Sequence, residues 1–249
     1  TVDTNGKISP YEEQDFSKKN KEVNLEILLE NNADQFFQNY KILIIGRQVA
    51  TNLSTYIDLL GVDESGSSVV IELKRDRTPR ETIAQLLEYA SYIDGLTYDN
   101  LADVFRDYDG SGIELSDYHK EYLQTAEEIS ISWNKKVRLL IIAQNITNEI
   151  QQVATYLRKT GIDIACIEFK YFVTKSGEEI ISSDYTLGEE ELLHIKTTSS
   201  SVSRINKKEF IDELDENGKR AFDRIDKFIE NKGMLVRWGA KGFSANYQS

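Results

Sequence analysis

Residues 55–75 read TYIDLLGVDESGSSVVIELKR, which is two strand-like runs joined by a short polar turn. The runs at residues 55–62 and 68–75 are rich in apolar and β-branched side chains, as strands are. The connection at residues 63–67 is polar and contains a glycine. This stretch therefore predicts an antiparallel hairpin, and it is the strongest single indication of the fold.

Charged side chains gather on one face of this hairpin. Because side chains alternate along a strand, Glu72 and Lys74 point to the same face. If the turn pairs Val62 with Ser68, Asp58 lies directly opposite Glu72, with Cβ atoms about 5 Å apart. Two carboxylates and a lysine would then meet at one place.

Such a meeting of carboxylates is costly unless a cation is present. Like charges directly opposite each other destabilise a sheet, and half-buried carboxylates need a proton or a cation. Phosphodiester cleavage uses a metal ion held by acidic oxygens, a positioned water and a cation near the phosphate. An exposed polar hairpin with an ordinary Lys–Glu pair explains Asp58, Glu72 and Lys74 equally well, since this spacing also occurs by chance.

A helix is predicted after the hairpin. The segment TPRE at residues 78–81 has a capping hydroxyl, a proline at the first helical position and a glutamate three residues after the cap. Gln85 and Tyr89 are four residues apart and lie on one stripe, which we expect to be distinct from the apolar face. The apolar face is predicted to consist of Ile83, Leu86, Leu87, Ala90 and Ile93.

Arginines lie between the end of the second strand and the start of this helix. They are Arg75, Arg77 and Arg80, and Arg47 is a further candidate. A phosphate backbone at this place would meet both guanidinium groups and a helix N-terminus. These four residues are the candidate nucleic-acid-binding set; a solvated rim of charges is the equally open alternative.

The rest of the first 190 residues alternates between strands and helices. Strands are predicted at residues 41–45, 137–143, 162–173 and 179–182; helices are predicted at 17–32, between 143 and 161, and in part of 95–130. The first of these strands is expected to end at Gly46. Alternation of this kind favours a mixed α/β sheet with helices on both faces, and residues 1–190 are predicted to form one domain.

The C-terminal part of the chain is predicted to be separate. Residues 196–204 are rich in serine and threonine and are typical of a linker. Residues 205–249 are expected to form a small appendage with a helix at 210–232 and a strand pair at 234–247. It is too small to bury a core of its own. It therefore either docks on the first domain or belongs to an incomplete second domain.

Composition limits the classes of function. The hydrophobic share of 40 % supports a packed core, and no apolar run is long enough to cross a membrane. The N-terminus lacks a signal-peptide pattern, and Cys166, the only cysteine, is expected to be a buried thiol; both fit the cytoplasm. His119 and His194 are expected at the surface, and neither suggests a zinc site.

The formal net charge of −12 speaks against a broad phosphate-binding surface. It does not exclude a local cleft in which metal ions and a few cations bind nucleic acid.

Taken together, these motifs resemble those of a known family. Residues 25–92 are similar to the restriction-like nuclease domain of the NucS endonuclease family, which has the PD-(D/E)xK type of site. The matching pieces are LEILL at residues 25–29, IGRQV at 45–49, DLLGVD at 58–63, VVIELKR at 69–75, and the Gln85–Tyr89 pair. The resemblance continues more loosely through Phe172, over about two-thirds of the chain.

This resemblance implies a restriction-endonuclease-like sheet and a metal-dependent endonuclease that hydrolyses DNA with Mg²⁺ or Mn²⁺. It implies that Asp58 and Glu72 hold the metal, and that Glu26 on the preceding helix binds metal or water. Lys74 corresponds to the lysine that orients the water or stabilises charge on the phosphate. The family's separate N-terminal DNA-binding domain has no counterpart here, so the expectation concerns the nuclease domain.

Gln85 and Tyr89 correspond to the pair that supports the family's site. The expected partner is DNA, RNA cleavage stays open, and a homodimer would suit the cutting of both strands. The rival interpretation is a catalytically inactive module of the same fold that binds nucleic acid or protein; the acidic net charge favours it and the intact acid–acid–lysine set speaks against it.

Overall fold

The protein is described by a computed structural model. It covers residues 6, 11–37, 41–123, 131–174, 177–188, 207–212, 214, 216–232, 235–238 and 243–246. The chain divides into two compact units, Thr1–Glu190 and Glu191–Ser249, and each is described by itself. The expected linker at residues 196–204 and His194 lie outside the described residues.

The first unit is built around one mixed sheet. Its elements are β1 (Glu12–Gln14), a 3-10 turn (Phe16–Lys18), α1 (Glu22–Asn31), α2 (Ala33–Phe36), β2 (Ile42–Ala50), β3 (Tyr56–Asp63), β4 (Ser68–Arg77), α3 (Glu81–Asp94), α4 (Tyr98–Asp109), α5 (Leu115–Leu123), β5 (Val137–Asn145), α6 (Asn148–Lys159), β6 (Ile164–Val173) and β7 (Glu179–Leu187). The strand order is β1-β6-β5-β4-β3-β2, and β7 pairs with β6 as well.

The sheet is parallel in its centre and antiparallel outside it. Strands β4, β5 and β6 run parallel, whereas the pairs β2–β3, β3–β4, β6–β7 and β1–β6 are antiparallel. Parallel strands are usually buried on both faces. This explains why β4 and β5 have nearly continuous apolar runs, VVIEL and VRLLIIA.

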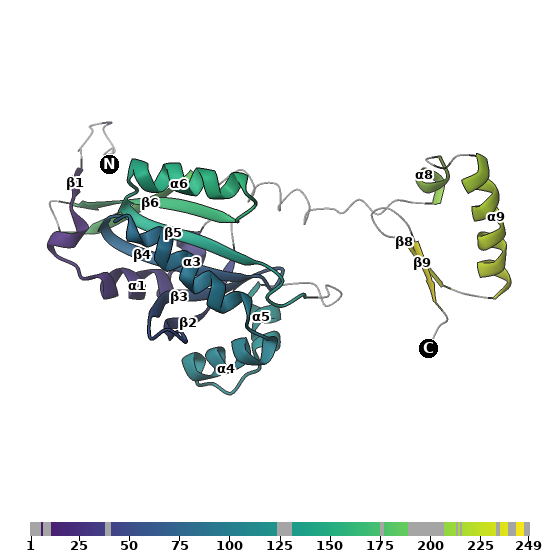
Figure 1. Cartoon of the computed structure of the whole chain (residues 1–249), viewed down its shortest axis with the longest axis horizontal. Helices are drawn as coiled ribbons and strands as arrows, with labels where there is room; N and C mark the ends of the chain where they lie inside the picture. The colour runs from purple at the N-terminus through teal and green to yellow at the C-terminus, as the bar shows by residue number, and fades with distance from the viewer. Residues whose placement is uncertain are drawn as a thin grey trace. The chain divides into compact units, whose positions relative to one another are not determined.

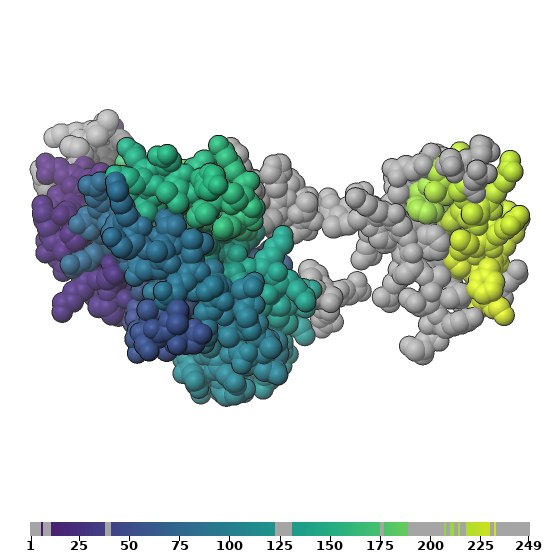
Figure 2. All heavy atoms as spheres, in the orientation of Figure 1, coloured from purple at the N-terminus to yellow at the C-terminus, as the bar shows by residue number. Residues whose placement is uncertain are grey.

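Helices cover both faces of the sheet. On one face, residues of α3, α4, α5 and α6 pack with β3, β4 and β5 into one core cluster. On the other face, α1 and α2 pack with the opposite side chains of the same strands. Figure 1 shows α6 and α1 on opposite sides of the sheet, and Figure 2 shows α3, α4 and α6 forming much of one surface. The predicted mixed sheet flanked by helices is confirmed.

The hairpin has the predicted register. Val62 pairs with Ser68, and the ladder continues to Leu59 and Ile71. At the turn, the Asp63 N–H donates to the Ser67 carbonyl at 3.0 Å. Gly66 has φ +84°, a conformation that glycine adopts at little cost. This register sets the positions of all the candidate side chains that the two strands carry.

Two predicted boundaries were wrong because tertiary contacts decide them. Strand β2 does not end at Gly46 but continues past it, with a bulge between Ile44 and Gly46. A Cβ atom on Gly46 would stand 3.0 Å from a Val104 methyl on α4, so this glycine permits close packing. The helix after the hairpin begins at Glu81, because the Thr78 hydroxyl accepts a bond from the Thr147 N–H at 2.9 Å and does not cap the helix.

Other departures are smaller. The helix expected from residue 17 begins at Glu22, after a 3-10 turn that Asp15 caps by accepting the Ser17 N–H. Strand β7 extends five residues beyond the predicted Ser182, to Leu187. Leu87, assigned to the apolar face of α3, is 36 % exposed. Cys166 is buried as predicted, and burial raises the pKa of its thiol to about 12.

The second unit contains α8 (Lys207–Asp212), α9 (Glu216–Asn231) and the antiparallel pair β8 (Leu235–Trp238) and β9 (Phe243–Asn246). A helix and a strand pair were expected here, and the single helix expected at residues 210–232 is two helices. Phe222 and Ile229 of α9 are buried, whereas Ile225 is exposed. In the described part of both units, no helix has the length and apolarity needed to cross a membrane.

Candidate active site

The candidate site lies where strands β3 and β4 separate. Their ladder ends at Leu59 and Ile71, so Asp58 is the first residue of β3 beyond it. The Oδ2 atom of Asp58 accepts the backbone N–H of Leu73 at 2.8 Å. The Asp58 carboxylate thus accepts a hydrogen bond from a strand N–H that would otherwise need a backbone carbonyl as its acceptor. Asp58 is thereby held against β4, next to Glu72 and Lys74.

Glu72 and Lys74 form a close pair at this point. The Lys74 Nζ atom lies 2.5 Å from Glu72 Oε1 and 3.9 Å from Glu22 Oε1 on α1. Glu72 is only 2 % exposed. Its burial, followed by the charge of Asp58, raises its pKa to about 7. The three predicted residues of the hairpin therefore meet as expected.

Lys74 keeps its positive charge in this buried setting. Burial alone would lower its pKa, but the carboxylates around it, Glu72 first, outweigh burial and raise the pKa above its usual value. The pKa of Asp58 is raised by burial, against the opposing bond from the Leu73 N–H. The site therefore combines a firmly charged cation with carboxylates that are poorly solvated.

Helix α1 adds acidic side chains to the same place. Glu26 is buried, and its pKa is raised first by burial and then by the charge of Asp58. Its neighbours on the helix have different contacts: Glu22 accepts the Arg75 N–H at 3.2 Å, and Glu30 pairs with Arg47 at 3.2 Å. Of these three glutamates, Glu26 is the one that is buried.

Helix α3 places Tyr89 beside the carboxylates. Tyr89 is 4 % exposed and belongs to the core cluster, so the expectation of a stripe distinct from the apolar face is wrong for this residue. Burial, followed by the charges of Glu72 and Asp58, raises its pKa to about 12. Gln85 lies one turn earlier and is half-buried.

The donor set suits a divalent cation. In the described part of the chain, Glu26 Oε2 and Glu72 Oε2 are buried oxygens without a hydrogen-bond partner, a costly arrangement. Among those same residues, no three His, Cys, Asp or Glu side chains converge closely enough to hold a metal by themselves. Mg²⁺ commonly takes only one or two carboxylates and completes its shell with water and phosphate oxygens. Asp58 and Glu72 fit that requirement.

Contacts of two further residues at this site were not predicted from the sequence. The Gln48 side chain on β2 donates from Nε2 to Asp58 Oδ1 at 3.1 Å, and Gln48 has φ +51°. Glu22 contacts both Lys74 and the Arg75 N–H. Gln48 lies in the IGRQV motif, which could have indicated it as a site residue. For Glu22 the sequence offered only its spacing of four residues from Glu26 on the same helix.

The candidate arginines are in three settings. Arg47 is held by Glu30 and lies 3.8 Å from Glu26, so it faces the carboxylates. Arg75 donates to the Asn20 carbonyl at 2.9 Å.

Arg77 and Arg80 are exposed. Arg77 lines an open cleft of about 650 Å³ at the C-terminal ends of β4 and β5. Arg80 borders a neighbouring cleft and pairs with Glu149 at 3.6 Å.

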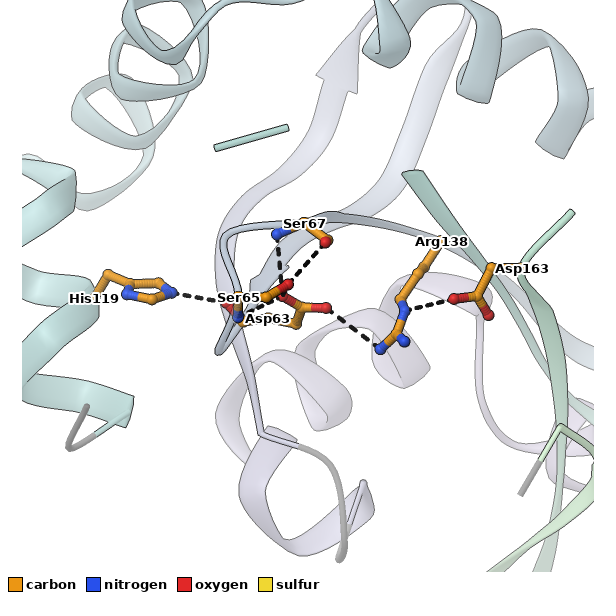
Figure 3. A network of polar contacts seen from close by, with 6 residues as sticks. All are labelled: Asp63, Ser65, Ser67, His119, Arg138 and Asp163. Carbon is orange, nitrogen blue, oxygen red and sulfur yellow. Dashed lines mark hydrogen bonds and ion pairs between the residues drawn. The ribbon is translucent and has the colours of Figure 1, made fainter. Parts of the chain in front are cut away.

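The opposite end of the hairpin holds a different polar network (Figure 3). The Asp63 carboxylate accepts the N–H groups of Ser65 and Ser67 at 2.8 and 3.0 Å and pairs with Arg138 at 3.3 Å. His119 of α5 donates from Nε2 to the Asp63 carbonyl at 2.7 Å and is fully buried. The expectation of a surface His119 is therefore wrong.

One family of known proteins matches part of the first unit. Residues 21–106 match the family described as the endonuclease NucS C-terminal domain. A comparison with curated proteins found no match.

Three solved structures are similar in part. They are an EndoMS–dsDNA2 complex (21 % identity, TM-score 0.34, covering 59 % of this chain and 44 % of that one), a repair endonuclease from Pyrococcus abyssi (19 %, 0.34, 60 % and 48 %) and EndoMS in apo form (20 %, 0.32, 60 % and 47 %). The chain thus spans less than half the length of each. The matched residues 21–106 include Glu26, Asp58, Glu72 and Lys74, so this part of the chain is similar to the NucS C-terminal domain.

Proposed function

We propose that the first unit is a metal-dependent endonuclease that hydrolyses phosphodiester bonds of DNA, using Mg²⁺ or Mn²⁺. One observation carries the proposal: Asp58, Glu72 and Lys74 meet where two strands separate, and a buried carboxylate oxygen of Glu72 has no hydrogen-bond partner among the residues that the structure describes. A purely structural cluster would be expected to satisfy that oxygen, because an unpaired buried acceptor is destabilising. DNA as the substrate is supported by the family match.

In this proposal, Asp58 and Glu72 bind the metal, and Glu26 binds metal or water. When bound, the metal would supply an activated water and polarise the phosphate. Lys74 contributes a fixed positive charge close to both carboxylates, where it can orient the water or stabilise charge that develops on the phosphate oxygens.

Helix α3 contributes support to the site. The hydroxyl of Tyr89 stays protonated at neutral pH because its pKa is about 12. It can therefore serve as a hydrogen-bond donor toward the acidic cluster. Gln85, half-buried one turn earlier, is proposed to support the same cluster.

The exposed arginines beyond the site are proposed to contact the DNA backbone. Arg77 and Arg80 line clefts next to the end of β4, three and six residues after Lys74. Phosphate contacts of this kind position DNA without reading its sequence. Arg47 and Arg75 are engaged within the protein, so they would have to exchange their present partners for a phosphate.

Cleavage of circular DNA tests the proposal, because circles lack ends and report internal cuts. Supercoiled plasmid, circular single strands and a structured RNA are incubated with wild-type protein and Mn²⁺, with and without EDTA. Asp58→Ala and Lys74→Ala are compared with Glu64→Ala, which changes an exposed turn residue. We expect metal-dependent cleavage by wild type and Glu64→Ala alone. Equal cleavage by all four proteins would show contamination and remove the assignment.

A catalytically inactive binding module is the second candidate. It is favoured by one observation: Lys74 already neutralises Glu72 at 2.5 Å, and Asp58 already has bonds to both oxygens. Calorimetric titration with Mn²⁺ separates the two candidates. Metal binding that Glu72→Ala abolishes supports the nuclease; no binding, or binding unchanged by that substitution, supports the module. A homodimer and a cytoplasmic location stay predictions.

A further inference from the structure

Gln48 occupies an unusual position on strand β2. Its neighbours Arg47 and Val49 pair with Leu59 and Ile57, so Gln48 lies across from Asp58. Its φ of +51° lies in the left-handed region, which a glutamine seldom adopts. It follows the bulge at Ile44 and Gly46, which changes the direction of side chains along the strand.

The side chain of Gln48 completes the support of Asp58. Its Nε2 donates to Asp58 Oδ1 at 3.1 Å, while the Leu73 N–H holds Oδ2 at 2.8 Å. Asp58 is therefore tethered from the strands on both sides of it.

We infer that Gln48 is a positioning residue, which holds the Asp58 carboxylate in the orientation needed to bind the metal. This inference rests on the proposed function. Groups that orient a metal ligand are commonly as important as the ligand itself, and their loss weakens metal binding about 10- to 100-fold. Unfavourable backbone conformations persist where the surroundings compensate for them, and they gather at functional sites.

A glycine substitution separates this role from a purely structural one. Glycine adopts positive φ readily, so Gln48→Gly relieves the backbone while it removes the amide. Ser54 is a matched control: it has φ +61° in the connection between β2 and β3 and is exposed. Ser54→Gly gives the same backbone relief without a change at the carboxylates.

The measurement is calorimetric titration of the full chain with Mn²⁺, together with thermal unfolding in EDTA. We expect Gln48→Gly to weaken Mn²⁺ binding by about tenfold or more, with an unfolding temperature equal to or above that of wild type. Ser54→Gly should bind Mn²⁺ as wild type does. A structural role alone would lower the unfolding temperature of Gln48→Gly and leave Mn²⁺ affinity unchanged, which would overturn the inference.

Three further outcomes are informative. If Gln48→Gly does not fold, Gln48→Asn replaces it: asparagine tolerates the left-handed region, but its amide is one methylene too short to reach Asp58. Wild-type affinity in Gln48→Asn would then overturn the inference. If the wild-type protein itself binds no Mn²⁺, the proposed function fails and the role of Gln48 fails with it. If wild type binds and Gln48→Gly binds equally, only the role of Gln48 fails.

Discussion

The two ends of the β3–β4 hairpin each bury carboxylates, but they satisfy them differently. At the turn, Asp63 accepts bonds from Ser65 and Ser67 and pairs with Arg138. At the open end, Glu72 has the single bond to Lys74, and its Oε2 atom has no partner within the described residues. A buried carboxylate with a complete set of partners is typical of a structural role. The incomplete set is what a ligand site requires.

The largest expected effect is the loss of cleavage at the open end. Glu72→Gln keeps the shape of the side chain but removes a metal-binding charge. Metal ions stabilise such transition states by several kcal/mol, so we expect single-turnover cleavage to fall on the order of 1,000-fold. Because Glu72→Gln removes a poorly solvated charge but also the closest partner of Lys74, unfolding in EDTA is measured alongside to show that the variant is folded. A loss of less than tenfold in rate would contradict the assignment of Glu72.

The next largest effect concerns stability at the turn. Asp63→Ala leaves Arg138 without its Asp63 partner and frees the N–H groups of Ser65 and Ser67. Removal of one partner of a buried ion pair costs about 3 kcal/mol. Urea denaturation should show this loss, while Mn²⁺ affinity of the folded protein stays at the wild-type value. Reduced Mn²⁺ affinity in the folded variant would contradict the claim that the turn end is structural and only the open end binds metal.

The two ends should also respond to pH in opposite directions. Burial lowers the pKa of His119, so the unfolded chain takes up a proton below about pH 6.5 before the folded protein does, and stability is lost as pH falls. The pKa of Glu72 is raised to about 7, so its contribution to stability is lost as pH rises toward 7.

Each group contributes at most about 1.4 kcal/mol per pH unit. Urea denaturation in EDTA between pH 5 and pH 7.5 measures both slopes. Relative to wild type, His119→Gln should make stability fall more steeply with rising pH, and Glu72→Gln should make it fall less steeply. Parallel curves for all three proteins would show that neither group is perturbed as described.

The smallest expected effect is on DNA affinity. Arg77→Gln should weaken binding of duplex DNA and reduce the dependence of log K on log salt by about 0.9, the value for one phosphate contact. Lys136→Gln is the matched control, because Lys136 is an exposed cation next to the turn end of β4. Equal effects of the two substitutions would indicate general charge attraction rather than a contact at Arg77.

The hairpin was predictable because its signals are local. Side-chain alternation and the turn at residues 63–67 set the register, and the register places Asp58 near Glu72. The match of residues 21–106 confirms the family resemblance that the short motifs suggested. The roles of the individual site residues stay predictions.

What the sequence could not show depends on contacts between distant segments. Thr78 looks like a helix cap but bonds to Thr147, which is 69 residues away. His119 is buried against Trp133 and the Asp63 carbonyl, which no spacing of residues reveals. The contact of Gln48 with Asp58 accompanies a bulge and a left-handed φ, and neither has a clear signature in a single sequence.

The most direct test compares Asp58→Asn with Asp63→Asn in one assay. Both replace an acidic side chain on β3, one at each end of the hairpin. Single-turnover cleavage of circular DNA with Mn²⁺ is measured at a temperature at which both variants are folded. We predict that Asp63→Asn cleaves within a few-fold of wild type and that Asp58→Asn shows no metal-dependent cleavage. Cleavage by Asp58→Asn at the wild-type rate would contradict the central claim that the open end of the hairpin is the active site.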